Sequence, residues 1–434
     1  MALSFGTSGV REITGKFDLR RIVEIGYNFS KGRKRVGVAW DCRSSSELYA
    51  HALISGIEAG GTDVEVLGFV PSPVAEFMIR HRKLDGVAII TASHNPKEWN
   101  GIKIVDKNGV IIPQERANAM LEEKVVVPSA WNSIGKDIVV KGVMETYLSE
   151  IRKHADIQLI KKAKLKVAVD CSNCTAVNVL PLFREIAELF VFNEKVDGSF
   201  PGRPSEPKEA NIQELINFVK EGNADIGIAW DGDGDRISLA APSGFVSGDV
   251  VFALAAERKL RHKKGIVVST VGTSNVVDEV VKAAGGSVVK TKVGVPYIVE
   301  KLIEVGGIMA GEEVGGTVWP EFSYAKDGFL TGLKMLEIEA EEGIENALRR
   351  MPKYWLIKEK VECTEKKKAM EAIYAKYPQA NMVDGVRVDM EDGSWFLIRP
   401  SGTENFIRVF AESKDKAKAE KIARELVEFV KQNA

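Results

Sequence analysis

Short runs of apolar, β-branched residues recur along the chain, and polar turn residues follow each of them. Three such runs are residues 34–41 (KRVGVAWD), 165–171 (LKVAVDC) and 264–270 (KGIVVST). Each run is entered through lysine or arginine and leads into a helical pattern of apolar and polar positions. Continuous apolar runs of this length are typical of strands in parallel sheets that are buried on both faces. The pattern therefore predicts three α/β units in series.

Each predicted unit contains another apolar strand that leads into an unusual loop. These segments are residues 86–94 (GVAIITASH), 225–236 (DIGIAWDGDGDR) and 306–316 (GGIMAGEEVGG). In parallel sheets, ligands bind at the carboxyl ends of the strands. We therefore expect each loop to lie at a ligand-binding edge of its sheet.

The last part of the chain has a different pattern. Residues 354–363 (YWLIKEKVEC), 385–390 (GVRVDM) and 394–413 read as strands, and a helix is expected from about Lys414. Such an order is typical of a small α+β domain with a mainly antiparallel sheet. The predicted fold class is therefore α/β, with three consecutive similar units of mixed, largely parallel sheets and a smaller C-terminal α+β domain. The expected domains are residues 1–148, 149–246, 247–352 and 353–434.

The composition and net charge indicate which kinds of partner the protein has. The chain has 434 residues, of which 45% are hydrophobic, and its 60 Lys and Arg residues nearly balance 61 Asp and Glu residues, for a net charge of -1. No overall field draws such a chain to nucleic acid or to an anionic membrane. The first residues lack a cationic start followed by an apolar stretch, and we find no uninterrupted apolar run near the roughly 18 residues that a membrane helix needs. A cytoplasmic protein without nucleic-acid or membrane partners is expected, and its oligomeric state stays open.

Two of the four cysteines, Cys171 and Cys174, form a C-x-x-C sequence after a predicted strand. A zinc site would need a further pair of Cys or His residues at suitable spacing, and the sequence has none. Thiols stay reduced in the cytosol, so we interpret both as plain thiols at a strand end, with a redox role as the alternative.

Three alternating carboxylates follow the strand of the second unit. Asp231, Asp233 and Asp235 are separated by glycines that allow the backbone to fold tightly. An EF-hand is excluded because Pro242 stands where its bidentate glutamate is needed, and because a strand precedes the loop. A solvated acidic turn is the alternative. Three carboxylates so close repel one another, so the loop predicts a hard divalent cation, in the first place Mg²⁺.

The other loops carry groups that suit a phosphorylated ligand. Residues 399–408 (RPSGTENFIR) place a guanidinium, hydroxyls and backbone amides in one turn, which suits a phosphate dianion. Glu312 and Glu313 lie on a glycine-rich loop where a carboxylate could accept hydrogen bonds from sugar hydroxyls. An ordinary polar turn is the alternative for both. The loop of the first unit places Ser93 and His94 directly after a strand, with Lys103 nearby, as in a loop presented for chemistry.

The four motifs T-A-S-H-N-P, D-G-D-G-D-R, G-E-x-x-G-G and R-P-S-G-T-E occur in this order and spacing. Together they resemble the α-D-phosphohexomutase family, which comprises phosphoglucomutases, phosphomannomutases and phosphoglucosamine mutases. The stretches FGTSGVRE at the N-terminus and DGSFPGRPSEP at residues 197–207 also look like this family. The resemblance covers essentially the whole chain, and it implies four domains around one central cleft.

The resemblance also implies roles for the loop residues. Ser93 matches the serine that carries the phosphoryl group, and the three aspartates match those that hold Mg²⁺ together with an oxygen of the phosphoserine. His94 and Lys103 match the positions assigned to proton transfer, and Arg11 lies near the phosphoserine. The positions that correspond to substrate-binding residues are Arg236, Lys292, Glu312, Glu313, Arg399, Ser401, Gly402 and Thr403.

The expected activity is a phosphohexomutase that moves a phosphoryl group between O1 and O6 of glucose or mannose phosphate. A sugar 1,6-bisphosphate would be its intermediate and activator. Val314 and Gly316 replace a serine and a histidine found in many relatives, which removes a polar contact with the sugar and predicts broad specificity. The alternatives are a phosphoglucosamine mutase, in which Glu313 favours a protonated 2-amino group, a metal-dependent phosphatase, and a phosphosugar-binding sensor.

Overall fold

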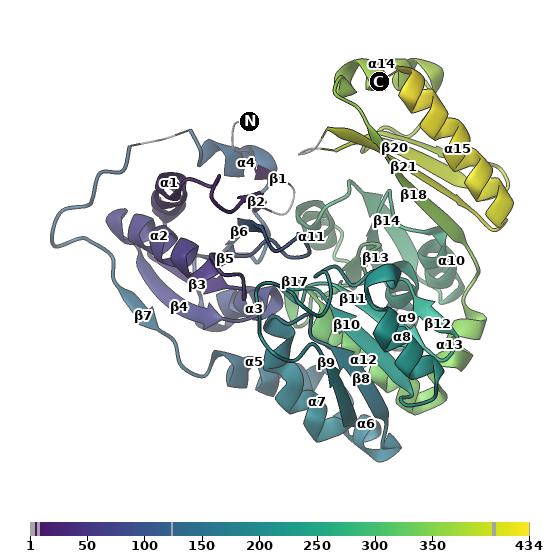
Figure 1. Ribbon diagram of the computed structural model, residues 1–434, viewed down its shortest axis with the longest axis horizontal. Coiled ribbons are helices and arrows are strands. Elements are labelled where there is room, and N and C mark those ends of the chain that lie inside the picture. Colours follow the sequence, from purple (N-terminus) through teal and green to yellow (C-terminus); the bar gives the residue numbers. More distant parts are fainter. Residues whose placement is uncertain (1–4, 7–8, 123–124, 402–404, 434) are drawn as a thin grey trace. The chain divides into compact units, whose positions relative to one another are not determined.

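The structure is a computed structural model that describes residues 5–6, 9–122, 125–401 and 405–433. The chain divides into two compact units. The first contains residues 1–255 and 314–349, and the second contains residues 256–313 and 350–434. Figure 1 labels their helices and strands.

The first sheet of the first unit has the strand order β1-β2-β6-β5-β3-β4-β7. Its strands β5, β3, β4 and β7 are parallel, whereas β6, β2 and β1 pair antiparallel. The strands are β1 (Phe5–Gly6), β2 (Gly9–Ile13), β3 (Arg35–Trp40), β4 (Asp63–Phe69), β5 (Gly86–Ile90), β6 (Trp99–Asp106) and β7 (Asp137–Val139). The helices of this region are α1 (Leu19–Ser30), α2 (Ser46–Ala59), α3 (Ser72–Arg82) and α4 (Gln114–Ala119). Apolar residues of α1 and α2 form one core with alternate residues of β3 and β5. Val87 and Ile89, which lie between the core residues of β5, are buried as well, and burial on both faces explains the continuous apolar run of this strand.

The second sheet of the first unit has the order β12-β11-β10-β8-β9. β8, β9 and β10 are parallel, and β11 and β12 continue the sheet in antiparallel pairing. The strands are β8 (Lys166–Asp170), β9 (Glu188–Phe192), β10 (Ile226–Trp230), β11 (Ile237–Ala241) and β12 (Gly244–Val246). The associated helices and 3-10 turns are α5 (Val143–Ile151), η1 (Arg152–His154), α6 (Ile157–Ala163), η2 (Thr175–Val179), α7 (Leu180–Ile186), η3 (Glu209–Asn211) and α8 (Gln213–Lys220). The apolar face of α8 packs on β8, β10 and β11.

The third α/β region contains strands in each unit. In the second unit, β13 (Ile266–Thr270) pairs in parallel with β14 (Ser287–Thr291) and with β15 (Met309–Gly311). In the first unit, β16 (Thr317–Trp319) and β17 (Ser323–Asp327) form an antiparallel pair. The helices of this region are α9 (Gly248–His262), α10 (Asn275–Ala283), α11 (Val295–Glu304), α12 (Gly328–Glu342) and α13 (Ile344–Arg350).

The C-terminal region is one antiparallel sheet of order β18-β21-β20-β19 with two helices. Its elements are β18 (Trp355–Glu362), α14 (Lys366–Lys376), β19 (Val386–Asp389), β20 (Trp395–Pro400), β21 (Phe406–Ser413) and α15 (Lys416–Asn433). Residues of α14 and α15 pack on one face of the sheet, while Trp395, Leu397 and Phe410 pack with Val271 of the third region.

Three α/β regions with parallel strands and a C-terminal α+β domain confirm the predicted fold class. The central cleft and the expected domain limits stay predictions. In the described part of the chain, no helix is both long and apolar enough to cross a membrane.

Candidate active site

The loop after β5 holds Ser93 in an unusual backbone conformation. Ser93 has a φ of 49°, in the left-handed region that residues other than glycine rarely adopt. Its N–H donates to Oγ1 of Thr91 at 2.8 Å, and its carbonyl oxygen accepts from Oγ of Ser205 at 3.0 Å. Contacts on both sides of the residue therefore stabilise a conformation that the serine would not adopt alone.

Arg43, which follows β3, is buried and binds the same loop. Its guanidinium is buried and donates to the carbonyl oxygens of Ser93 at 2.9 Å, Asn95 at 2.6 Å, Pro96 at 2.6 Å and Trp99 at 2.9 Å. Nε of Arg43 also contacts Oδ2 of Asp41 at 3.1 Å. One charged side chain thus binds four carbonyl oxygens of this irregular loop and of the start of β6.

The loop between β10 and β11 brings three carboxylates together. Ligand oxygens of Asp231, Asp233 and Asp235 all lie within 4.8 Å of one another. Burial and the two neighbouring carboxylates raise the pKa of Asp231 well above its ordinary value. Burial would also raise the pKa of Asp235, but Lys326, Lys103 and Arg236 outweigh it and hold that pKa well below its ordinary value.

The hydrogen bonds of this cluster leave oxygens that suit a cation. Among the described residues, Oδ1 of Asp233 and Oδ1 of Asp235 are buried and have no hydrogen-bond partner. The nearest cations to Oδ1 of Asp235 are Nζ of Lys326 at 3.7 Å and Nε of Arg236 at 3.9 Å, beyond hydrogen-bond distance. Buried carboxylate oxygens without donors are costly, and hard divalent cations prefer such ligands. The donor set therefore fits Mg²⁺.

Lys103 of β6 is a buried cation between two domains of the first unit. Its Nζ lies 3.0 Å from Oδ2 of Asp233, 3.2 Å from Oδ2 of Asp235 and 4.0 Å from Oε1 of Glu76. Burial lowers the pKa of Lys103, but Asp233, Asp235 and Glu76 outweigh it and raise the pKa above its ordinary value. The ammonium therefore offsets part of the negative charge of the aspartates.

His94 and Arg11 complete the surroundings of Ser93. Nδ1 of His94 lies 3.3 Å from Oγ of Ser93, and that hydroxyl donates to Oδ2 of Asp231 at 2.7 Å. Burial, with Arg236 and Arg11 nearby, lowers the pKa of His94 well below its ordinary value, so the imidazole is neutral. Arg11 of β2 donates to Oδ1 of Asn95 at 2.7 Å, and burial lowers its pKa to about 10.

The first unit thus brings together eight of the predicted residues around one buried point. They are Arg11, Ser93, His94, Lys103, Asp231, Asp233, Asp235 and Arg236. Arg236 takes part through its N–H, which donates to Oδ1 of Asp231 at 3.1 Å. A serine hydroxyl bonded to one member of a carboxylate cluster, with an imidazole beside it, can serve phosphoryl transfer.

The remaining predicted residues lie on the second unit. Nζ of Lys292 lies 5.5 Å from the centre of the Tyr297 ring, and Glu312 is buried just after β15. Nη2 of Arg399 forms an ion pair with Oδ2 of Asp384 at 3.1 Å, and the carbonyl oxygen of Ser401 accepts from Nζ of Lys366 at 2.7 Å. Gly402 and Thr403 lie outside the described residues. The roles of all these residues, and of Glu313, stay predictions.

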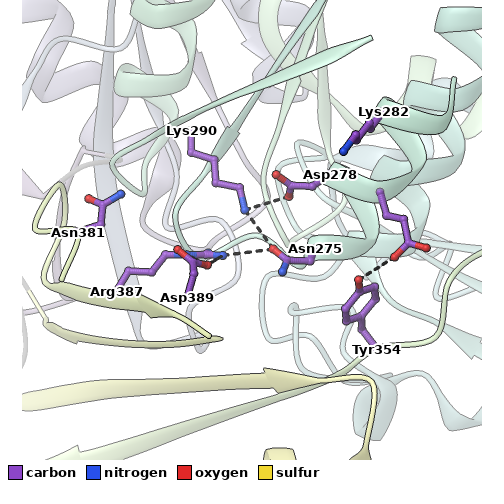
Figure 2. A pocket seen from close by; sticks show the side chains of 9 residues that line it. Asn275, Asp278, Lys282, Lys290, Tyr354, Asn381, Arg387 and Asp389 are labelled. Atoms are coloured by element: carbon purple, nitrogen blue, oxygen red, sulfur yellow. Dashed lines mark hydrogen bonds and ion pairs between the residues drawn. The ribbon is translucent and has the colours of Figure 1, made fainter. Parts of the chain in front are cut away.

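A polar pocket of about 470 Å³ in the second unit is a different site (Figure 2). Residues of α10, β14 and β19 line it, and their charges are largely paired with one another. Nζ of Lys290 lies 2.9 Å from Oδ2 of Asp278, and Nη2 of Arg387 lies 2.8 Å from Oδ1 of Asp389. Asn275 joins both pairs, because its Oδ1 accepts from Lys290 at 3.3 Å and from Arg387 at 3.2 Å. We interpret this pocket as a polar contact between the third and fourth regions.

Several supporting residues were missed at the level of sequence. Four of them contact the site residues but belong to none of the four motifs, namely Arg43, Ser72, Glu76 and Lys326. Thr91 is a further supporting residue, and its T-x-S spacing to Ser93 is a signal in the sequence, since serine and threonine side chains often bond backbone N–H groups two residues away. The others act from distant segments and give no local pattern.

The fold and the buried serine and carboxylate cluster are those of a phosphoryl-transferring α/β enzyme. Models of the four phosphoglucomutase/phosphomannomutase domains match the chain: alpha/beta/alpha domain I at residues 2–125, domain II at 145–244, domain III at 247–354 and the C-terminal domain at 356–429. The chain belongs to the phosphoglucomutase/phosphomannomutase family, and it is an enzyme of the phosphomutase class.

Individual relatives agree with this assignment. The chain is 38% identical to a phosphoglucomutase/phosphomannomutase of Thermococcus kodakarensis, with 99% of this chain and 98% of that protein covered. It is 34% identical to a probable phosphoglucosamine mutase of Methanosphaera stadtmanae, with 98% of each covered. A solved phosphoglucomutase/phosphomannomutase family protein of Burkholderia thailandensis has a TM-score of 0.87 at 27% identity, over 98% of this chain and 97% of that one.

Proposed function

We propose that the protein moves a phosphoryl group between O1 and O6 of glucose and mannose phosphates through a phosphoserine at Ser93. The observation that carries this proposal is the hydrogen bond of 2.7 Å between Oγ of Ser93 and Asp231, at the centre of the buried carboxylate cluster. Phosphoserine would donate its phosphoryl group to the free hydroxyl of the sugar phosphate and give a sugar 1,6-bisphosphate. The bisphosphate would then return its other phosphate to Ser93, so that no phosphate is lost.

The cofactor that we propose is one Mg²⁺ per active site. Asp231, Asp233 and Asp235 would hold it together with an oxygen on Ser93, and Oδ1 of Asp233 and of Asp235 are oxygens that lack a donor in the described structure. A bound Mg²⁺ supplies a positive charge that stabilises the charge developing on a phosphoryl group during transfer. Lys103, Arg11 and Arg236 contribute fixed positive charge around the same atoms.

Proton transfer would be carried out by His94 or Lys103. When Ser93 gives its phosphoryl group to the sugar, the sugar hydroxyl must lose a proton and Oγ of Ser93 must gain one. The two oxygens exchange these roles when the other phosphate passes back to Ser93. His94 is the residue whose ring nitrogen lies within 3.3 Å of Oγ of Ser93, whereas Nζ of Lys103 contacts the aspartates directly. Replacing each residue in turn, by glutamine for His94 and by methionine for Lys103, separates the two candidates by the loss of kcat.

Substrate binding is proposed for residues of the second unit. Glu312 would accept hydrogen bonds from sugar hydroxyls, and Arg399 with Ser401, Gly402 and Thr403 would bind the phosphate that is not reacting. Lys292 would add a further positive charge. Because O3 and O4 are common to glucose, mannose and glucosamine, a glutamate that binds them does not discriminate at C2. Val314 offers no side-chain hydrogen bond either, so we expect kcat/KM for glucose and mannose phosphates to agree within about a hundredfold.

Phosphoglucosamine mutase is the second candidate function. Oε2 of Glu313 is buried and has no hydrogen-bond partner among the described residues, so it is available to a protonated 2-amino group. One relative carries the name probable phosphoglucosamine mutase, and another, from Methanococcus maripaludis, carries the name phosphoglucosamine mutase.

Conversion of glucose 1-phosphate, mannose 1-phosphate and glucosamine 1-phosphate, measured side by side, tests both candidates. Replacing Glu313 with Gln should affect all three sugars equally if the enzyme is a broad mutase. A selective loss with glucosamine 1-phosphate supports the second candidate. A preference for glucosamine 1-phosphate of more than about a thousandfold over both hexose phosphates would exclude the first, because a site without a dedicated C2 contact discriminates only weakly.

A further inference from the structure

Ser72 connects a helix of the first α/β region to the aspartate loop of the second. It is the first residue of α3 and is completely buried. Pro71 precedes it and Pro73 follows it, and proline in the first helical turn fixes the backbone there. The N–H of Ser72 donates to the carbonyl oxygen of Asp233 at 2.9 Å. The helix start and the loop are therefore joined through the backbone before any side chain is considered.

The hydroxyl of Ser72 acts as both hydrogen-bond donor and hydrogen-bond acceptor at this contact. It lies 2.6 Å from Oδ2 of Asp233 and 3.1 Å from Nζ of Lys103. An ammonium group can only donate, so the hydroxyl accepts from Lys103 and its single proton points to Asp233. Each bond therefore fixes the direction of the other. Since both partners are charged, these bonds are of the stronger class.

The same contact gives the two carboxylate oxygens of Asp233 different surroundings. Oδ2 accepts from Ser72 and from Lys103 at 3.0 Å, whereas Oδ1 is buried and accepts no hydrogen bond from the described residues. A carboxylate that rotated about its Cβ–Cγ bond would exchange these two oxygens. Donors on one oxygen alone prevent that exchange.

We propose that Ser72 is a positioning residue: its hydroxyl holds Oδ2 of Asp233 and the ammonium of Lys103 in one arrangement, and so presents Oδ1 of Asp233 to the divalent cation. This inference rests on the proposed cation site at the aspartate cluster. Ser72 would touch neither the cation nor the sugar. It would act through Asp233 and Lys103 alone, from a segment 161 residues away in the sequence.

Cation affinity tests the inference without relying on turnover. Mn²⁺ accepts the same oxygen ligands as Mg²⁺ and is counted directly by electron paramagnetic resonance. The full-length protein is titrated with Mn²⁺ as the parent and as the variants Ser72→Ala, Ser72→Thr and Ser269→Ala. Ser269 is the matched control, since it is equally buried, lies in β13, and its hydroxyl has no hydrogen-bond partner among the described residues.

Ser72→Ala should weaken Mn²⁺ binding by about tenfold or more, because one charged hydrogen bond is lost on each of two partners. Ser72→Thr keeps the hydroxyl and should stay within about threefold of the parent, as should Ser269→Ala. At saturating Mg²⁺, Ser72→Ala should lower kcat while KM for the sugar phosphate is unchanged. In an Asp233→Asn background, Ser72→Ala should have little further effect, since the two changes act on one contact.

The outcomes separate this inference from the proposed function. A parent protein that binds no Mn²⁺ at the aspartates contradicts the cation site itself. If the parent binds Mn²⁺ and Ser72→Ala binds it equally well with unchanged kcat, the role of Ser72 is wrong while the proposed function stands. Should Ser72→Ala fail to fold, Ser72→Cys takes its place, because a thiol is a weak donor of similar shape. Parental Mn²⁺ affinity in Ser72→Cys would then overturn the inference.

Discussion

Ser93 is held in place by polar contacts to its backbone, and its hydroxyl donates to Asp231. Thr91 and Ser205 bind its backbone, and Arg43 binds the carbonyl oxygens of the loop. The left-handed conformation of Ser93 is a cost of the order of 1 kcal/mol or more that these contacts must offset. A residue held in this way presents its side chain in one direction, which a transfer reaction requires.

The carboxylates next to Ser93 give a prediction for the cation. Removal of divalent metal with excess chelator should abolish turnover, and added Mg²⁺ should restore it. Asp233→Asn should lower Mn²⁺ affinity and slow phosphoryl transfer, because an amide oxygen is a neutral and weaker ligand than a carboxylate. Isothermal titration calorimetry or electron paramagnetic resonance measures the affinity for Mn²⁺, and a coupled enzyme assay measures the rate of turnover.

Ser269→Ala, which changes a buried hydroxyl of β13 in the second unit, is again the control. Undiminished turnover in excess chelator, with metal analysis showing that no divalent ion remains, would contradict the cation requirement.

Single residues differ in how far the sequence alone reveals them. Asp231, Asp233 and Asp235 could be predicted because their spacing within one loop already implies convergence. Ser72 and Arg43 could not, because they contact the site from other segments and use a hydroxyl and backbone carbonyl groups that no motif records. Which oxygen of Asp233 is free is likewise a property of the packed structure.

At the scale of elements, the fourth region is attached to the third through a buried arginine. Arg387 of β19 donates to the carbonyl oxygen of Val271 at 2.5 Å and stacks on the ring of Trp395 at 4.0 Å. Trp395 donates in turn to Oε1 of Glu412 at 2.6 Å, and the same oxygen accepts from the N–H of Asn275 at 2.8 Å. Figure 2 shows how Asn275 and Arg387 meet. These contacts come from α10, β19, β20 and β21, so they join the two regions within the second unit.

Arg387→Met should lower the free energy of unfolding by about 3 kcal/mol, because it removes a buried charge from a network that includes buried Glu412. Chemical denaturation measures the change. Lys421→Met is the control, because its ion pair with Glu425 lies on the surface and should contribute less than about 1 kcal/mol. Equal stability of the two variants would contradict a structural role for Arg387.

The loop after β20 gives a prediction about substrate binding. Arg399→Ala should raise KM for all three sugar phosphates, and it should lower kcat as well if binding of the distal phosphate also positions the reacting end. Arg408→Ala, a change of another arginine in the same sheet, is the matched control. Steady-state kinetics that match the parent for every substrate would show that Arg399 does not bind the phosphate.

Elements and their order could be predicted well from apolar periodicity. Strands β3, β8 and β13 coincide with the three valine-rich runs, because a strand buried on both faces needs a continuous apolar run. The same patterning also predicts the antiparallel C-terminal sheet. What periodicity could not give is pairing between distant strands, such as the antiparallel pairing of β6 with both β2 and β5, which places Arg11 and Lys103 near Ser93.

At the scale of the whole molecule, four family domains in one chain define a phosphomutase, whereas we propose that its preferred sugar depends on a few loop residues. Val314 and Glu313 are the residues that we expect to decide it. The family assignment follows from the whole chain and does not depend on either of them.

The central claim is that Ser93 carries the phosphoryl group and returns it to the sugar. Phosphorus NMR of a reaction with glucose 1-phosphate, Mg²⁺ and a trace of glucose 1,6-bisphosphate tests it most directly. For the parent protein we predict that glucose 6-phosphate accumulates without inorganic phosphate, and that peptide mass analysis finds the phosphoryl group on Ser93. Ser93→Ala should lose nearly all of this conversion. Accumulation of inorganic phosphate by the parent, or full conversion by Ser93→Ala, would contradict the claim.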